Sequence, residues 1–229
     1  MSDSTPQISS SSIVLVGSFN PTIFQPEWFA RQGLMPKEQV EAAQIKVIVP
    51  EVSHFETEQV VFQVTQERFI ASSNPNANAA PLRDLVQGAF FILEHTPVTA
   101  MGLNRHMHFP LQSEATWHQV GDKLAPKDPW IGILEGSAGL QSLFITTARG
   151  SNTGGWREKE YPGARYTVRV EPSTQIKFGV YFETNEHYPA PKEEPLGAVM
   201  KILGERWEES QNHALRIANH ILDWAGASR

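Results

Sequence analysis

Apolar residues along this 229-residue chain recur with two different periods, one typical of strands and the other of helices. Short apolar runs and alternating patterns predict strands at 13–19, 45–49, 59–65, 68–72, 98–109, 140–148, 165–171 and 176–184. The turn Glu171-Pro172-Ser173-Thr174 joins the last two of these strands. The many strands and tight connections indicate antiparallel pairing.

Two longer segments show the helical period. In 82–94 the apolar residues stand at offsets 0, 3, 4, 7, 8 and 11, which is one stripe of a 3.6-residue helix. A second stripe runs through 196–224 with spacings of four and three. Shorter helices are expected at 26–33, which begins with Pro and ends with Gly, and at 114–124 behind the capping residue Ser113.

These elements predict an α+β fold in which an antiparallel sheet, or two sheets, carries two main helices packed on one face. Residues 1–12 are polar and serine-rich, so we expect a disordered tail followed by a single domain over 13–229. The halves 13–110 and 111–229 each read as strand, hairpin, linker and helix. This order suggests an internal strand–hairpin–helix duplication, although two ordinary α+β units fit equally well because the residues themselves do not repeat.

Composition narrows the classes of function. The formal net charge is −6 and there is no run of Lys or Arg, so we expect no nucleic-acid partner. There is no Cys, which excludes disulfides, thiolate metal sites and cysteine nucleophiles. No apolar segment is long enough for a membrane helix, and the N-terminus does not have the pattern of a signal peptide. We therefore expect a soluble, cytoplasmic protein.

The stretch LNRHMHF at 103–109 carries the most distinctive chemistry. On a strand His106 and His108 point to the same side, where two imidazoles can share a zinc or another divalent ion. His118 could supply a third ligand, and Glu114 stands one helical turn before it as a possible general acid or base. This combination would serve a metal-dependent hydrolase.

The same histidines also have a simpler interpretation. With eight His in 229 residues, chance gives a His-x-His pair in roughly one such chain in four. Alternation places Met101, Met107 and Phe109 on the core face, so the two histidines should point away from it. They are then surface or interface residues.

Other candidates concern binding. Trp156 follows a Gly-rich loop where an aromatic side chain calls for a contact, and Arg105 and Asn104 are further binding candidates beside the histidines. The Gly136-Ser137-Ala138-Gly139 segment does not form the Gly-x-Ser-x-Gly motif of a nucleophile elbow and predicts a turn. The middle of the last helix, 208–213, is polar while its ends are apolar. This pattern suggests that one end packs on a second copy in a homodimer.

The segments SIVLVGSFNP, LEHTPVTAMGLNRHMHF and KLAPKDPW, together with the long final helix, resemble a family of conserved bacterial proteins of unknown activity. The resemblance implies a compact, cytoplasmic α+β protein and assigns no catalytic residue or cofactor.

The sequence thus favours a non-enzymatic binding or interaction protein without a cofactor, whose partner is another protein or a small ligand and which forms a homodimer. The metal-dependent hydrolase is the alternative, so the sequence leaves open whether the protein is an enzyme. A third possibility is a ligand cavity between helices and sheet, walled by Phe90, Phe178 and Phe182.

Overall fold

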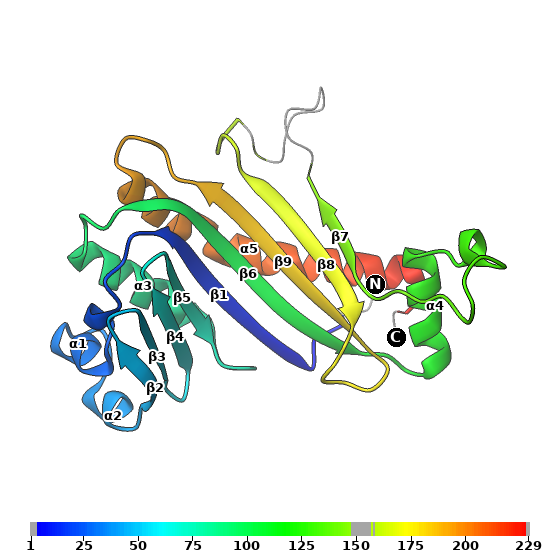
Figure 1. Ribbon diagram of the computed structural model, residues 1–229, viewed down its shortest axis with the longest axis horizontal. Helices are drawn as coiled ribbons and strands as arrows, with labels where there is room; N and C mark the ends of the chain where they lie inside the picture. Colours follow the sequence, from blue (N-terminus) through cyan, green and yellow to red (C-terminus); the bar gives the residue numbers. More distant parts are fainter. Residues whose placement is uncertain (1–3, 148–156, 158, 228–229) are drawn as a thin grey trace.

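A computed structural model describes residues 4–147, 157 and 159–227 of the protein. Within them a single nine-stranded antiparallel sheet dominates, in the order β2-β3-β4-β5-β1-β6-β9-β8-β7. The long helix α5 runs across one face of this sheet (Figure 1). The strands are β1 (Ile8–Gly17), β2 (Gln44–Val49), β3 (Val52–Glu56), β4 (Val60–Thr65), β5 (Arg68–Ser73), β6 (Val98–Pro110), β7 (Leu143–Thr146), β8 (Arg165–Pro172) and β9 (Gly179–Pro189). The helices are α1 (Pro26–Arg31), α2 (Lys37–Glu41), α3 (Ala80–Ile92), α4 (Glu114–Leu124) and α5 (Pro195–Ala225), with short 3-10 turns η1 (Pro21–Ile23) and η2 (Asp128–Trp130).

The expected fold class is wrong in its proportions. Instead of two main helices on a sheet, one 31-residue helix and one large sheet organise the protein, and the next longest described helix has 13 residues. The expected duplication is not present either, because the first half contributes β1–β6 and the second β7–β9 among the described residues. The physical reason lies in β6, which pairs with β1 on one side and β9 on the other and thereby fuses both halves into one sheet.

Most individual elements lie where the pattern placed them. Helices α3, α4 and α5 confirm the segments expected at 82–94, 114–124 and 196–224, and Ser113 caps α4 by accepting a hydrogen bond from Thr116 N. The strands differ in several places: β3 was not expected, the strand expected at 140–148 is limited to Leu143–Thr146, and two strands begin at other residues. Strand β1 begins at Ile8, so the serines assigned to a tail lie in the strand. Strand β9 begins at Gly179, since Phe178 takes a left-handed φ of 54° in the turn before it.

The core consists of two apolar clusters under α5. The first surrounds seven buried phenylalanines from the β1–β6 half, which pack edge-on and tilted against one another: Phe19, Phe24, Phe29, Phe55, Phe62, Phe69 and Phe90. The second lies between β6, β8, β9 and the C-terminal half of α5. There the helix presents Ala214 and Ala218, both fully buried, and these small side chains let the helix approach the sheet closely.

A buried polar layer separates the two clusters. Glu186 of β9 and Arg206 of α5 form an ion pair there, with Glu186 also accepting hydrogen bonds from Tyr188 and Ser210. Arg105 of β6 donates to the backbone oxygen of Gln211 in the same layer. The polar middle of α5 therefore covers polar groups of the sheet inside this chain, and it is no longer an argument for a second copy. None of the described helices is long and apolar enough to span a membrane.

Candidate functional site

The face of the sheet opposite α5, called the open face from here on, carries the histidines of LNRHMHF. Alternation along β6 sends Met107 and Phe109 into the core under α5, as expected. His106 and His108 consequently lie on the open face, which no described helix crosses in Figure 1. The histidines therefore belong to a different surface from the hydrophobic core.

Strand register brings three partners beside the histidines. His108 stands opposite Tyr181 of β9, and His106 stands opposite Glu183. Arg169 of β8 stands opposite Glu183 in turn. Because residues directly opposite each other on adjacent strands share a face, these five side chains form one cluster on the open face.

Hydrogen bonds connect the cluster into a chain. The Tyr181 hydroxyl lies 2.7 Å from His106 Nδ1 and 3.2 Å from the Glu183 carboxylate. Arg169 pairs with Glu183 at 2.6 Å and stacks its guanidinium 5.3 Å from the centre of the Tyr181 ring. Such linked polar groups hold one another in a single arrangement.

The second histidine is anchored separately. His108 Nδ1 lies 2.8 Å from the Ser173 hydroxyl, in the turn that joins β8 to β9. The same Ser173 oxygen accepts hydrogen bonds from the backbone N–H groups of Gln175 and Ile176. Its lone pairs are thus occupied, and its own hydrogen goes to His108 Nδ1. This arrangement assigns the proton of the neutral His108 ring to Nε2.

Both imidazoles keep Nε2 free for a ligand. In the part of the chain that the structure describes, no group is bonded to Nε2 of His106 or His108, and neither nitrogen belongs to the buried polar atoms that lack a partner. Tyr181 OH has a single hydrogen, so His106 Nε2 is a donor when that hydrogen points to Nδ1 and an acceptor when it points to Glu183. His108 Nε2 is therefore a fixed hydrogen-bond donor, and His106 Nε2 can either donate or accept.

The environment keeps these groups uncharged. Burial lowers the pKa of His106 below its usual value, with Glu183 acting upward and Arg169 downward. Burial also lowers the pKa of His108, and the neighbouring His106 adds to the effect. Burial raises the pKa of the Tyr181 hydroxyl to about 12. At neutral pH the two imidazoles are neutral and the phenol is protonated.

A hollow of about 450 Å³ opens in front of the two histidines. It is lined by residues from β1, β6, β8, β9 and the β8–β9 turn, among them Ser10, His106, His108, Arg169, Glu171 and Tyr181. Its volume is that of a small-molecule site. One arginine and two glutamates, Glu171 and Glu183, leave a net negative charge around it.

The remaining predicted site residues are dispersed. Asn104 lies on the open face, where it donates to Ser12 Oγ and accepts from Asn185. Arg105 points to the other side, into the buried polar layer. His118 and Glu114 face each other at 3.9 Å on the exposed surface of α4, on a different element from His106 and His108. Trp156 lies outside the described residues.

Of the three histidines proposed as metal ligands, the structure brings His106 and His108 together and leaves His118 on a different element. Across residues 4–147, 157 and 159–227, no group of three or more His, Cys, Asp or Glu side chains is arranged to hold an ion. His106 and His108 do share a face, and each has its Nδ1 held by a hydroxyl, which is how metal-binding imidazoles are commonly oriented. Within the described part of the chain, no side chain stands beside them as a third ligand.

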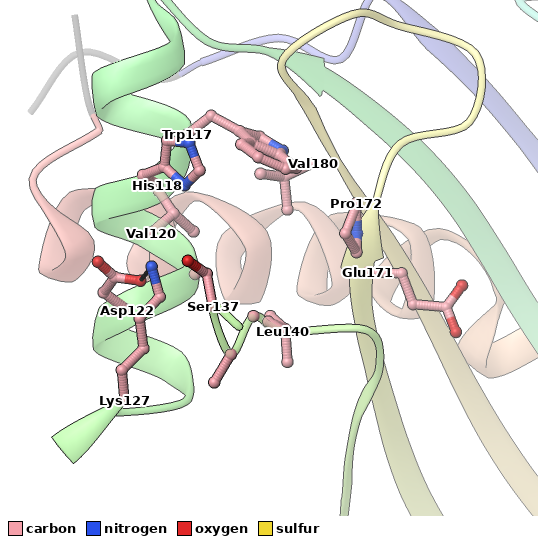
Figure 2. Close-up of a pocket in the computed structure, with 13 residues that line it drawn as sticks. Trp117, His118, Val120, Asp122, Lys127, Ser137, Leu140, Glu171, Pro172 and Val180 are labelled. Carbon is pink, nitrogen blue, oxygen red and sulfur yellow. Dashed lines mark ion pairs between the residues drawn. The ribbon is translucent and has the colours of Figure 1, made fainter. Parts of the chain in front are cut away.

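His118 belongs to a second, smaller pocket of about 220 Å³ between α4 and the β8–β9 hairpin. Figure 2 shows Trp117 and His118 on the α4 side, Pro172 and Val180 on the hairpin side, and Leu140 closing the bottom. Ser137 of the predicted turn lines it, while Glu171 points away from it. The interior is mostly apolar, and the Asp122–Lys127 ion pair at 2.7 Å lies on its rim.

A third cavity of about 890 Å³ lies between the C-terminal end of α3 and the N-terminal end of α5. Phe90 lines it, as the cavity hypothesis expected, together with Phe91, whose side chain is exposed. Phe178 and Phe182 are not in its wall: Phe182 is fully buried in the second apolar cluster, and Phe178 lies in the β8–β9 turn.

Sequence reasoning missed Tyr181, Glu183, Arg169 and Ser173. A signal was present, because the apolar Val180 and Phe182 alternate with Tyr181 and Glu183, which therefore face the other side of the strand. What the alternation did not contain was the register that puts them next to the histidines. A comparison with models of known protein families finds no match, and a comparison with curated proteins finds no significant relative.

Proposed function

We propose that this is a non-enzymatic binding protein that holds a small polar ligand, neutral or cationic, in the hollow of the open face. The proposal rests on one observation: both histidines are anchored through Nδ1, so that two Nε2 atoms, spaced as neighbours on one strand, remain for the ligand. Groups held in place before binding lose little entropy when the ligand arrives, which favours specific recognition.

The state of each polar group favours recognition over chemistry. The Ser173 oxygen has its lone pairs occupied by backbone N–H groups, so it is a poor nucleophile in spite of its contact with His108. The Tyr181 hydroxyl, with a pKa of about 12, stays protonated and serves as a hydrogen-bonding group. The site therefore suits a ligand with both donors and acceptors.

Charge selects among such ligands. Arg169 is already paired with Glu183 at 2.6 Å and lies 3.7 Å from Glu171, so its charge is not available to an anion. The two carboxylates exceed the single guanidinium, and this excess favours amines, amides and polyols over phosphates or carboxylates. The proposal keeps the cytoplasmic location and the bacterial source suggested by the sequence.

The test is an NMR titration that reads the ring nitrogens of His106 and His108 directly. Panels of small amines, amides and polyols are added to the ¹⁵N-labelled protein, with inorganic phosphate and acetate as anionic comparisons. We expect at least one neutral or cationic compound to shift Nε2 of both histidines, and the shifts to vanish in His108→Phe. His118→Ala, on the separate surface of α4, is the matched control and should bind like the wild type. Shifts produced by the anions alone would contradict the proposed ligand class.

The hydrolase keeps one supporting observation, the anchored pair His106 and His108. It also requires a third ligand and a tightly held metal ion, which the metal measurement described in the Discussion tests.

A further inference from the structure

The two edges of the sheet differ in how they are protected. Strand β2, at one edge, carries Lys46 in its middle and has an irregular register between Ile45 and Val47. A lysine and a bulge are the common devices that keep an edge strand from pairing with another chain. Strand β7, at the other edge, reads Leu-Phe-Ile-Thr, without a charge and with a regular register against β8.

Hydrogen bonding shows which backbone groups of β7 face outward. Thr147 N donates to Tyr166 O at 3.0 Å, so positions 147, 145 and 143 face β8 in the alternating pattern of an antiparallel pair. The N–H and C=O groups of Phe144 and Thr146 consequently point away from the sheet. Among the described residues no strand lies beyond β7 to accept them.

The side chains of this edge are apolar and exposed. Phe144 is 63% and Ile145 56% exposed, one on each face of the strand. The segment after α4 and the C-terminal end of α5 lie at the same end of the molecule (Figure 1). They add further exposed apolar side chains: Trp130, Ile131, Ile133, Leu134 and Trp224. An uncharged strand edge with exposed apolar side chains on both faces marks an interaction surface.

We propose that two copies of this chain pair through β7 in antiparallel orientation, so that the two sheets continue across a twofold axis. A second copy is the occupant that the edge itself favours, because the strand is uncharged and its regular edge can pair with an identical edge without repulsion. Pairing of β7 with β7 also closes the assembly, whereas pairing of β7 with β2 would leave open ends and is opposed by Lys46.

The outward groups define the register. Phe144 of one copy faces Thr146 of the other, so each copy exchanges N–H···O=C bonds at both positions, about four in all. Ile145 then faces its own symmetry mate at the axis, in a pair without hydrogen bonds, where Cα atoms lie about 4.5 Å apart. The exposed side chains of Phe144 and Ile145 add apolar area to this contact, and a stable interface buries roughly 800 Å² per partner. This surface borders the open-face cluster, because Phe144 stands opposite Arg169 with its ring 5.7 Å from the guanidinium. The dimer itself is made by backbone groups of β7 and the ligand site by the histidines of β6, so the two proposals are tested by different variants and can fail independently.

The absence of cysteine from the chain makes a direct test available. In Ile145→Cys the two introduced thiols would meet at the axis, within the 4.4–6.8 Å between Cα atoms that a disulfide accepts. We expect mild oxidation to convert this variant into a covalent dimer within minutes. Ile45→Cys is the matched control, because Ile45 is 51% exposed on the opposite edge and should remain monomeric on a non-reducing gel. Equal cross-linking of both variants would overturn the proposal.

Sedimentation equilibrium of the wild type in about 0.15 M salt, where repulsion between two chains of charge −6 is screened, supplies the second test. Thr146→Pro removes an outward N–H and leaves the bonds to β8 intact, which is where an edge strand tolerates Pro. We expect it to weaken dimerisation tenfold or more, since two hydrogen bonds are lost per dimer. Thr146→Ala keeps the N–H and should dimerise like the wild type. The proposal would be refuted by a wild type that stays monomeric at about 200 µM, a concentration at which a weak dimer forms. It would equally be refuted by a dimer that Thr146→Pro leaves unchanged.

Discussion

Glu186 of β9 and Arg206 of α5 are buried against each other in the middle of the protein, with Glu186 Oε2 3.6 Å from Arg206 Nη2. Their side chains are 1% and 4% exposed. Burial raises the pKa of Glu186, while the hydrogen bond from Tyr188 and the charge of Arg206 act against that increase. A charged pair in this position does little for net stability but makes the alignment of α5 with the sheet specific, because any shift would leave a charge without its partner.

Removing one member of this pair should therefore be costly. In Glu186→Ala the Arg206 guanidinium stays buried and, among the described residues, keeps Glu209 as its one acidic partner. We expect the free energy of unfolding to fall by about 3 kcal/mol, in the range known for broken buried ion pairs. Urea denaturation followed by tryptophan fluorescence measures the loss.

Two further variants identify its cause. The double variant Glu186→Gln/Arg206→Met removes both charges, so it should be less destabilised than Glu186→Ala alone. Glu208→Ala breaks a pair with Arg83 whose glutamate side chain is 80% exposed, and it should change stability by less than about 0.5 kcal/mol. If the double variant were the least stable of the three, the buried charge would not be the reason.

Local pattern predicted much of this protein correctly. Alternation along 98–109 assigned Met107 to the core and His106 and His108 to the opposite face, because side-chain direction in a strand depends only on position. The apolar stripes located α3 and α5 because side-chain direction in a helix also depends only on position. Gly226 ends α5 in the left-handed conformation that glycine favours.

Pairing between distant strands was beyond the reach of that reasoning. His108 and Tyr181 are 73 residues apart, and only the register of β6 on β9 makes them neighbours. The same limit explains the incorrect fold class, since alternation identifies strands but does not say that β6 joins both halves into one sheet. The polar middle of α5 was misinterpreted because its partners, Glu186 above all, come from another element.

Stability should fall as the solution becomes mildly acidic. Burial lowers the folded-state pKa of His106, His108 and His213 below the usual 6.5. The unfolded chain then takes up protons first, so the stabilisation is complete above pH 6.5 and is lost as the pH falls through the lower folded-state values. The raised pKa of Glu186 has the opposite sign, since its contribution is present below 4.5 and is lost as the pH rises. The urea concentration at the unfolding midpoint should therefore decrease as the pH is lowered from about 7.5 to about 5, a range that spans the usual histidine pKa of about 6.5.

Substitution separates the histidines from other titrating groups. Replacing His213 by Gln removes one of the three histidines with a lowered pKa. The urea midpoint of this variant should therefore fall less steeply than that of the wild type as the pH is lowered to about 5, roughly 1.5 below the usual histidine pKa. His118→Gln, at the exposed surface of α4, should leave the profile as it is in the wild type. Profiles that coincide for all three proteins would mean that burial of His213 does not contribute.

Metal content distinguishes the binding protein from the hydrolase. Among the described residues His106 and His108 have no third ligand beside them, so the purified protein should hold zinc at well below one ion per chain after dialysis. Elemental analysis of the wild type beside His106→Ala/His108→Ala makes the measurement. A full equivalent of metal in the wild type that disappears in the double variant would establish the hydrolase's metal site instead.

The Tyr181 hydroxyl links His106 to the Arg169–Glu183 pair, and its removal tests how the open-face site is organised. Tyr181→Phe keeps the ring over which Arg169 stacks but takes away the hydrogen-bond partner of His106 Nδ1. Loss of a partner for a half-buried polar group should cost about 1 kcal/mol of unfolding free energy. The tautomer ratio of the His106 ring is then no longer coupled to the Tyr181 hydrogen and should change, which ¹⁵N chemical shifts detect, while His108 stays fixed by Ser173. His108 is therefore the internal control: a tautomer change at both rings would mean that the variant disturbs the sheet, and a change at neither would mean that Tyr181 does not position His106.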